Sequence, residues 1–230
     1  MISTLTMKLF LITCSFCLLT RFALAQEATQ LNYANLSGAI GSQQASLSID
    51  YFHLWKLGKA KKIEVGFGGR FTSYVGSSQY FSSAPANLAA DITKSDSILI
   101  QSPQVNALNL AINLGYTISP KFGVGFSIDA VGITFGGNKS VSYINGNQGQ
   151  ATAASPTPLN ILLVGNNDQG TLNSEFYLRY FFNNSYAIKV AYQYLFTEYT
   201  TETEVQRLPE TNDRFRNKAS LLSLGLTKKF

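Results

Sequence analysis

The 230-residue sequence predicts an all-β protein, an antiparallel up-and-down β-barrel with eight strands. Three observations support this fold class. Apolar residues recur at every second position in several segments, which is the pattern of a strand with two different faces. The connections between these segments alternate between short and long. The polar faces consist of small residues and balanced charges, whereas the opposite faces are apolar and aromatic.

The segment 1–25 is expected to be a secretory signal peptide, which leaves 26–230 as a single mature domain. Lys8 is a positive charge near the start, 9–19 is an apolar core, and 23–25 contains the small residues of a cleavage site. Both cysteines of the chain lie in this leader, so we expect no disulfide or thiol chemistry in the mature protein. The small remaining positive charge does not indicate a nucleic-acid partner.

Seven segments of the mature chain alternate clearly. In chain order they are 47–55, 63–71, 108–118, 122–135, 172–182, 186–197 and 222–230. In 186–197, one face is Tyr, Ile, Val, Tyr, Tyr and Phe, and the other contains Ala, Lys and Gln. In 122–135 the apolar phase changes after Ala130, which predicts a β-bulge at that point.

The lengths of the connections predict where these strands begin and end. The short connections are 58–61, 119–120 and 183–185, and the long ones are 76–105, 136–170 and 200–217. Short turns on one side and long loops on the other are typical of transmembrane barrels. This order requires one more strand before the first short turn, and 31–40 is the segment with room for it. The total is then eight, with ten as the alternative if a long loop contains a hairpin.

The polar faces of the strands contain four acidic and four basic residues. The acids are Asp50, Glu64, Asp129 and Glu175, and the bases are Lys56, Arg70, Arg179 and Lys189. The interior of an eight-stranded barrel is just wide enough to be filled by side chains. We therefore expect these eight residues to form an ion network that closes the interior. The alternative fold is a soluble sandwich, in which the apolar faces would be buried against each other.

The apolar faces are expected to meet lipid, with aromatic residues at both interfaces. Trp55 and Phe122 lie near the short turns, and Tyr74 and Tyr199 lie near the long loops. Aromatic side chains concentrate in such girdles at the two membrane–water interfaces.

The end of the chain carries the most specific pattern. Leu222, Leu224 and Leu226 alternate with small or polar residues, and Phe230 is the last residue. With this ending the chain resembles the small outer-membrane β-barrels of the OmpA/OmpX-like class over nearly all of 26–230. The resemblance implies an outer-membrane location, contact with outer-membrane lipids, and recognition of the C-terminal strand by the barrel assembly machinery. Lys228 departs from the pattern, because an apolar or aromatic residue is usual at that position.

The sequence predicts a non-catalytic role, structural or in surface interaction, with no cofactor. The single histidine, His53, has no local partner, and no metal-ligand spacing is found. A narrow channel for small solutes is the first alternative, and an outer-membrane enzyme acting on lipid or peptide is the second. An extracellular partner would bind the long loops, whose apolar runs 98–100 and 161–164 are expected to extend strands or to pack as a cap. The short turns are rich in lysine, which favours anionic lipid or an acidic periplasmic partner.

Overall fold

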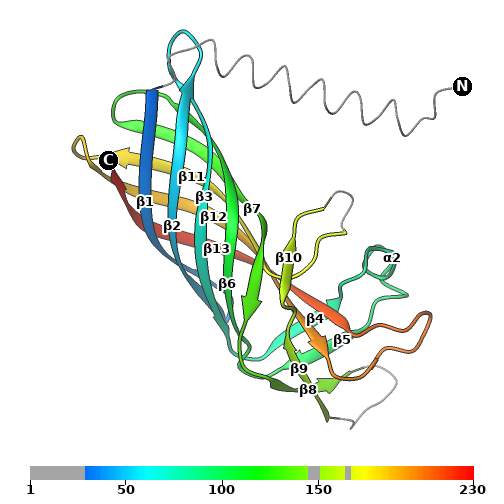
Figure 1. Ribbon diagram of the computed structural model, residues 1–230. Helices are drawn as coiled ribbons and strands as arrows, with labels where there is room; N and C mark the ends of the chain where they lie inside the picture. Colours follow the sequence, from blue (N-terminus) through cyan, green and yellow to red (C-terminus); the bar gives the residue numbers. More distant parts are fainter. Residues whose placement is uncertain (1–28, 145–150, 164–166) are drawn as a thin grey trace, which may run out of the picture.

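The computed structural model describes residues 29–144, 151–163 and 167–230, so the predicted signal peptide over 1–25 lies outside the described residues. The described residues form thirteen strands in one antiparallel sheet and one short helix (Figure 1). The prediction of an all-β, antiparallel chain is confirmed.

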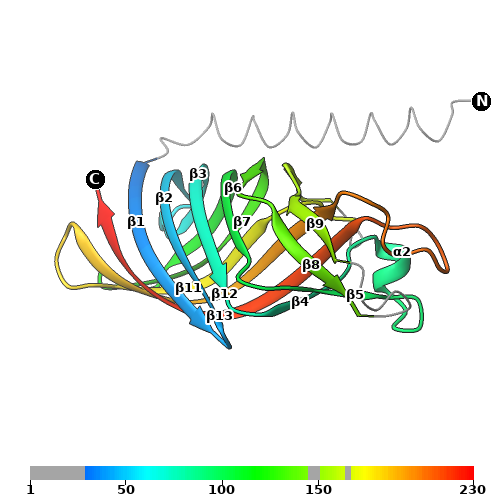
Figure 2. The ribbon, with the colours of Figure 1, turned by 90° about the horizontal axis from the view of Figure 1, so that it is seen from below.

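Eight of the described strands are long, with lengths from 10 to 16 residues. They are β1 (Thr29–Gly41), β2 (Gln44–Leu57), β3 (Ile63–Gly76), β6 (Gln104–Thr117), β7 (Phe122–Phe135), β11 (Leu172–Phe181), β12 (Tyr186–Thr201) and β13 (Arg214–Lys229). Each pairs with the next in this order, and β13 pairs back with β1 from Ile40↔Leu222 to Tyr33↔Lys229 (Figures 1 and 2). We call this set of paired strands the ring.

The predicted short connections all lie at one end of the ring, which we call the turn end. They join β2 to β3, β6 to β7, and β11 to β12. The long connections lie at the opposite end, called the loop end, where the two-residue turn between β1 and β2 also lies. This arrangement follows from strand direction, because consecutive antiparallel strands alternate between the two ends.

The long connections are not simple loops. They contain β4 (Gln79–Ser83), α2 (Ala86–Ala89), β5 (Ser97–Ile100), β8 (Lys139–Tyr143), β9 (Ala151–Pro156) and β10 (Leu159–Ile161). The expected total of eight strands, and the alternative of ten, are therefore both lower than the thirteen strands in the described residues. The difference arises because these extra strands are only three to six residues long.

Four of the short strands close a second, smaller ring at the loop end. β9 pairs with β12, β8 with β9, β5 with β8, β4 with β5, and β4 with β13. Because β12 and β13 also pair with each other, both hairpin strands belong to both rings. We call this second ring the cap. Its apolar side chains form one fully or nearly fully buried cluster that includes Phe81, Ile98, Ile100, Val141, Tyr199 and Phe215.

The change of phase in β7 is a β-bulge, as predicted. Leu110 pairs with Val131 and Ala111 pairs with Asp129, so Ala130 is the extra residue. The bulge lets Asp129 point into the ring while Val131, two positions later, is exposed on the outer face.

The two faces of the ring differ sharply in polarity. Leu110, Phe176 and Val190 are 59%, 64% and 43% exposed on the outer face. A sandwich would bury these residues, so the alternative of two stacked sheets is wrong. The expectation of girdle positions for Tyr74 and Tyr199 is also wrong, because both are fully buried in the cap cluster. Their side chains lie on the inner face of β3 and β12, where the ring meets the cap.

Candidate functional site: the charged interior of the ring

Arg70, on the inner face of β3, lies among three carboxylates and is 1% exposed. Its Nη1 lies 3.1 Å from Oδ1 of Asp129, its Nη2 lies 3.7 Å from Oε2 of Glu175, and its Nε lies 3.9 Å from Oδ2 of Asp50. Nη1 also donates a hydrogen bond to the carbonyl oxygen of Asn173 at 3.1 Å. The planar guanidinium, with its fixed fork of donors, therefore connects β3 to residues of three other strands, β2, β7 and β11.

Lys189 of β12 supplies the second positive charge of this group. Its Nζ donates to Oε2 of Glu175 at 2.9 Å and lies 3.8 Å from Oδ2 of Asp50. We call Asp50, Arg70, Asp129, Glu175 and Lys189 the central cluster. All five are buried, and an ion pair in a dry interior is stable only when further hydrogen bonds satisfy the remaining polar atoms.

Asp129 receives such hydrogen bonds from two neighbours. The side-chain amide of Asn109 donates to its Oδ2 at 2.7 Å, and the backbone N–H of Asn173 donates to the same oxygen at 2.9 Å. The bulge at Ala130 makes this possible, because it aims the carboxylate into the ring. Asp50 similarly accepts a hydrogen bond from the side-chain amide of Asn35.

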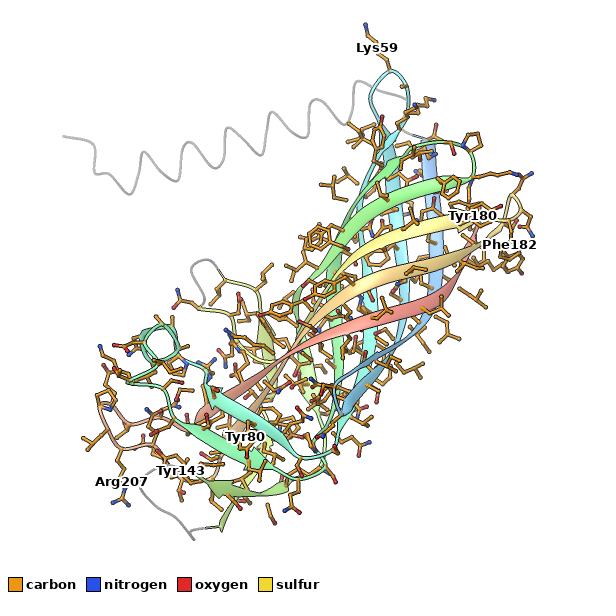
Figure 3. All side chains as sticks on the ribbon, turned by 180° about the vertical axis from the view of Figure 1, so that it is seen from behind. Lys59, Tyr80, Tyr143, Tyr180, Phe182 and Arg207 are labelled. Carbon is orange, nitrogen blue, oxygen red and sulfur yellow. The ribbon has the colours of Figure 1, made fainter. Side chains whose placement is uncertain are left out.

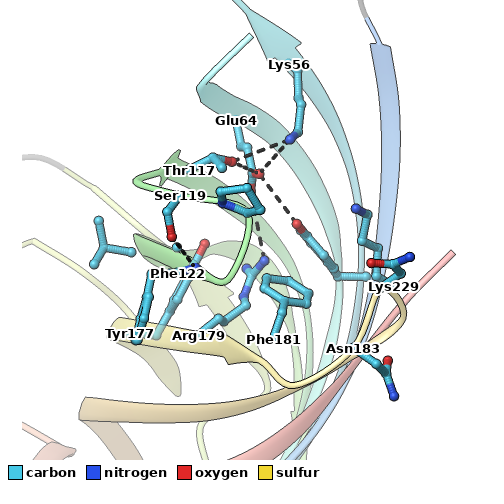
Figure 4. A pocket seen from close by; sticks show the side chains of 15 residues that line it. Lys56, Glu64, Thr117, Ser119, Phe122, Tyr177, Arg179, Phe181, Asn183 and Lys229 are labelled. Carbon is cyan, nitrogen blue, oxygen red and sulfur yellow. Dashed lines mark hydrogen bonds and ion pairs between the residues drawn. The ribbon is translucent and has the colours of Figure 1, made fainter. Parts of the chain in front are cut away.

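The other three predicted network residues form a separate group at the turn end (Figure 4). Glu64 accepts a hydrogen bond from Thr117 at 2.8 Å, and its carboxylate lies 3.7 Å from Nζ of Lys56 and 3.9 Å from Nη1 of Arg179. We call Lys56, Glu64 and Arg179 the turn-end cluster. Within the described ranges, no ion pair joins it to the central cluster, so the eight residues form two groups rather than one network.

Arg179 is held mainly by aromatic rings. Its guanidinium carbon lies 4.0 Å from the ring centre of Tyr33 and 4.3 Å from that of Tyr177. A cation between two aromatic rings is attracted to the partial negative charge on the face of each ring, and this attraction is stronger when water is excluded. Gly125 makes room for this arrangement, because a Cβ there would overlap the phenol of Tyr177.

The interior also contains an apolar layer that the sequence analysis did not identify. Leu31, Tyr33, Phe52, Leu54 and Ala111 form a buried cluster inside the ring. Phe52 and Leu54 pair across the strands with Gly68 and Gly66, respectively. The signal that could have found this layer is the coincidence of large residues on one strand with glycines on the next.

A third charged group, also missed, lies at the loop end. Glu198 of β12 is fully buried, and its carboxylate accepts hydrogen bonds from Nε of Arg214 at 2.8 Å and Nη2 of Arg216 at 2.7 Å. Arg214 and Arg216 fall within 200–217, which the sequence predicts to be a loop, so no strand partners were expected for them.

Three of the residues predicted as the assembly signal lie on the outer face of the last strand, and the fourth, Phe230, directly follows it. Leu222, Leu224, Leu226 and Phe230 are all exposed. β13 pairs with β1 on one side and with β12 on the other, so its backbone is used in the ring while these side chains point outward.

His53 has structural partners. Its Nδ1 lies 2.8 Å from the side-chain oxygen of Asn32, and its ring meets Trp55 edge-on at 4.8 Å. Within 29–144, 151–163 and 167–230, no cluster of three or more His, Cys, Asp or Glu residues has metal-binding geometry. No helix in these ranges is long and apolar enough to span a membrane.

No protein-family model and no curated protein matches the chain. Several solved structures of β-barrel proteins are similar to it. Ail of Yersinia pestis, the attachment invasion locus protein, has 9% identity and a TM-score of 0.38, covering 87% of this chain and 97% of Ail. The N-terminal β-barrel domain of Pseudomonas aeruginosa OprF has 9% identity and a TM-score of 0.37, covering 89% of this chain and 100% of the domain. Neisserial surface protein A has 12% identity and a TM-score of 0.36, covering 89% of this chain and 100% of that protein. At these values the likeness provides no residue-by-residue correspondence.

Proposed function

We propose that the chain is an integral outer-membrane protein whose eight ring strands form a closed transmembrane β-barrel. Its interior is plugged by side chains, and its cap presents a folded surface outside the cell. In this proposal the protein is non-catalytic and acts as a structural or surface-interaction protein. The lipids of the outer membrane surround the ring, and the barrel assembly machinery recognises the last strand.

The single observation that carries the proposal is the inverted polarity of the ring. Charged and amide side chains are buried on the inner face, whereas Leu, Ile, Val, Phe and Tyr side chains are exposed on the outer face. In water this distribution would expose a large apolar surface, but in a bilayer the apolar belt faces acyl chains. Closed pairing satisfies the backbone of every ring strand, which lipid cannot do.

Three layers of side chains support the proposed plug. The apolar layer around Phe52 and Leu54, the central cluster around Arg70, and the apolar core of the cap follow one another from the turn end to the loop end. The Arg70–Asp50 and Lys189–Glu175 pairs join neighbouring strands. The Arg70–Glu175 and Lys189–Asp50 pairs join strands that are not neighbours in the ring, so they cross the interior.

Cysteine labelling of the assembled protein in intact cells tests the orientation. Both native cysteines lie in the predicted leader, so a mature single-cysteine variant has one reactive thiol. Arg207 and Lys59 lie at opposite ends of the molecule (Figure 3). Arg207→Cys should react with a membrane-impermeant maleimide on intact cells, whereas Lys59→Cys should react only after the outer membrane is permeabilised.

Leu224→Cys, on the apolar belt, provides the control for lipid exposure. It should react with a lipid-soluble maleimide and resist the impermeant reagent in both preparations. Equal labelling of all three variants by the impermeant reagent in intact cells would contradict membrane insertion. Reversed labelling of the two ends would contradict the orientation alone.

A further inference from the structure

A cavity of about 200 Å³ lies inside the turn end of the ring (Figure 4). Its wall comes from β1, β2, β3, β6, β7, β11 and β13, together with the turns after β6 and β11. The polar side chains that matter here are Lys56, Glu64, Thr117, Arg179 and Lys229. The cavity therefore belongs to the folded ring rather than to one flexible turn.

The described wall of this cavity has more positive than negative charge. Lys56, Arg179 and Lys229 line it, and Glu64 is the only carboxylate among the described lining residues. One positive charge is balanced by Glu64, which leaves two in excess. Lys229 has no described carboxylate within ion-pair distance, and its Nζ lies 6.0 Å from the ring centre of Phe181.

Arg179 has hydrogen-bonding capacity to spare. Its Nη1 is 3.9 Å from the Glu64 carboxylate, which is too far for a hydrogen bond. Its Nε is buried and has no hydrogen-bond partner among the described residues. Tyr33 and Tyr177 cover the guanidinium, so its N–H donors are left at the edge of the guanidinium plane. Arg179 itself lines the cavity.

We propose that this cavity binds a phosphate group, with Arg179, Lys56 and Lys229 as its ligands. A guanidinium edge matches the oxygens of phosphate, and lysines act beside it as point charges. The excess of two positive charges complements a dianion better than a monocarboxylate. The phosphate is either free inorganic phosphate or the headgroup of a phosphomonoester lipid such as phosphatidic acid. This inference goes beyond the function proposed above, which assigns no ligand to the interior.

The test uses the full mature chain, folded in neutral detergent micelles and titrated with inorganic phosphate by isothermal titration calorimetry. We expect saturable binding, and a Kd at least about tenfold weaker in the double variant Lys56→Gln/Lys229→Gln, which loses two charged contacts. The matched control is Lys59→Gln/Lys121→Gln. It removes the same charge from the same end, but neither residue lines the cavity. Its Kd should stay close to that of the unmodified protein.

A second arm repeats the phosphate titration with the protein reconstituted in nanodiscs with and without phosphatidic acid. Weaker apparent binding of phosphate in the discs that contain phosphatidic acid identifies the headgroup as the source, whereas an unchanged Kd identifies the free ion. Absence of saturable binding in both arms overturns the proposal, as does equal weakening in the control variant. The β-sheet circular dichroism of each sample shows separately that the ring is folded, so failure here is distinguishable from failure of the proposed barrel.

Discussion

Arg70 is the residue on which the central cluster depends most. It interacts with three of the four carboxylates that sequence analysis placed inside, and all of these partners are buried. Lys189 interacts with only two of them, so it cannot replace Arg70 at Asp129.

Arg70→Ala should therefore lower the free energy of unfolding by about 3–5 kcal/mol, because it leaves buried carboxylates without their cation. Denaturant titration of the refolded protein in micelles measures the effect. Arg207→Ala is the control, since Arg207 is exposed at the loop end and should change stability by less than about 0.5 kcal/mol. Equal effects in both variants would mean that the cluster does not stabilise the interior.

Two adjacent glycines in β3 provide a matched test of packing. A Cβ on Gly68 would overlap the carbonyl oxygen of Tyr51 and lie 2.8 Å from Cα of Phe52, whereas one on Gly69 would meet no atom within 4 Å beyond its chain neighbours. Gly68→Ala should destabilise the protein by about 1–3 kcal/mol through overpacking. Gly69→Ala should be near neutral in the same unfolding experiment, and the opposite ranking would contradict the close approach of β2 and β3.

At the scale of the element, the side chains of each ring strand alternate between two faces. The inner face is polar and the outer face is apolar. β12 shows this from Tyr186 to Gln193, with Lys189 buried and Val190 exposed on the opposite face.

Val190→Arg should cost about 2–4 kcal/mol in lipid vesicles if Val190 lies near the bilayer midplane. Phe182→Arg, on the outer face at the turn end, should cost only about 0–1 kcal/mol, because a charge there reaches the interface (Figure 3). Urea unfolding in vesicles gives both values. Wild-type stability of Val190→Arg would show that this face does not meet lipid.

The cap depends on side chains that alternate in the same way on much shorter strands. Phe81 is fully buried and meets Tyr199 edge-on at 5.3 Å, whereas its neighbour Tyr80 is 60% exposed. Phe81→Ala should destabilise the cap by about 3–5 kcal/mol through loss of burial and the cavity left behind. Limited proteolysis should then cut the loop-end segments faster while the ring stays intact. Tyr80→Ala should leave the cleavage rate unchanged, and equal cleavage of both variants would contradict a packed cap.

At the scale of the whole molecule, the proposed plug predicts that ions do not pass through the interior. The apolar cluster, the central cluster and the cap core succeed one another along the axis. Protein inserted into planar bilayers should therefore show no stable open level. Reproducible conductance steps that vanish with heat-denatured protein would favour the alternative of a narrow channel.

The strand phases were predictable because the ring strands are long enough to show alternation. The inward direction of Asp50, Arg70 and Lys189 was predictable for the same reason. A charged residue that alternates with apolar residues in a barrel strand points into the interior, because the apolar residues face lipid. The division of the eight charged residues into two clusters was not predicted, because it depends on distances between strands that are remote in the chain.

The prediction that 98–100 extends a strand or packs as a cap is confirmed, because Ile98 and Ile100 lie in β5 and are buried in the cap cluster. Period-two patterns did not predict which strands pair in the cap. β5 has four residues, too few for alternation to be distinguished from a short apolar run, and its partner Tyr143 is distant in sequence. The burial of Tyr74 and Tyr199 was missed as a consequence, because without the cap both appeared to lie at an interface. The buried Glu198 also depends on β13 beginning at Arg214, earlier than the sequence suggests.

β12 and β13 belong to both the ring and the cap. Toward the turn end, β12 contributes Lys189 to the central cluster, and at the loop end the two strands contribute Tyr199 and Phe215 to the cap cluster. Because the same two strands carry Lys189 of the central cluster and part of the cap core, a substitution that disturbs their pairing is expected to weaken both regions together.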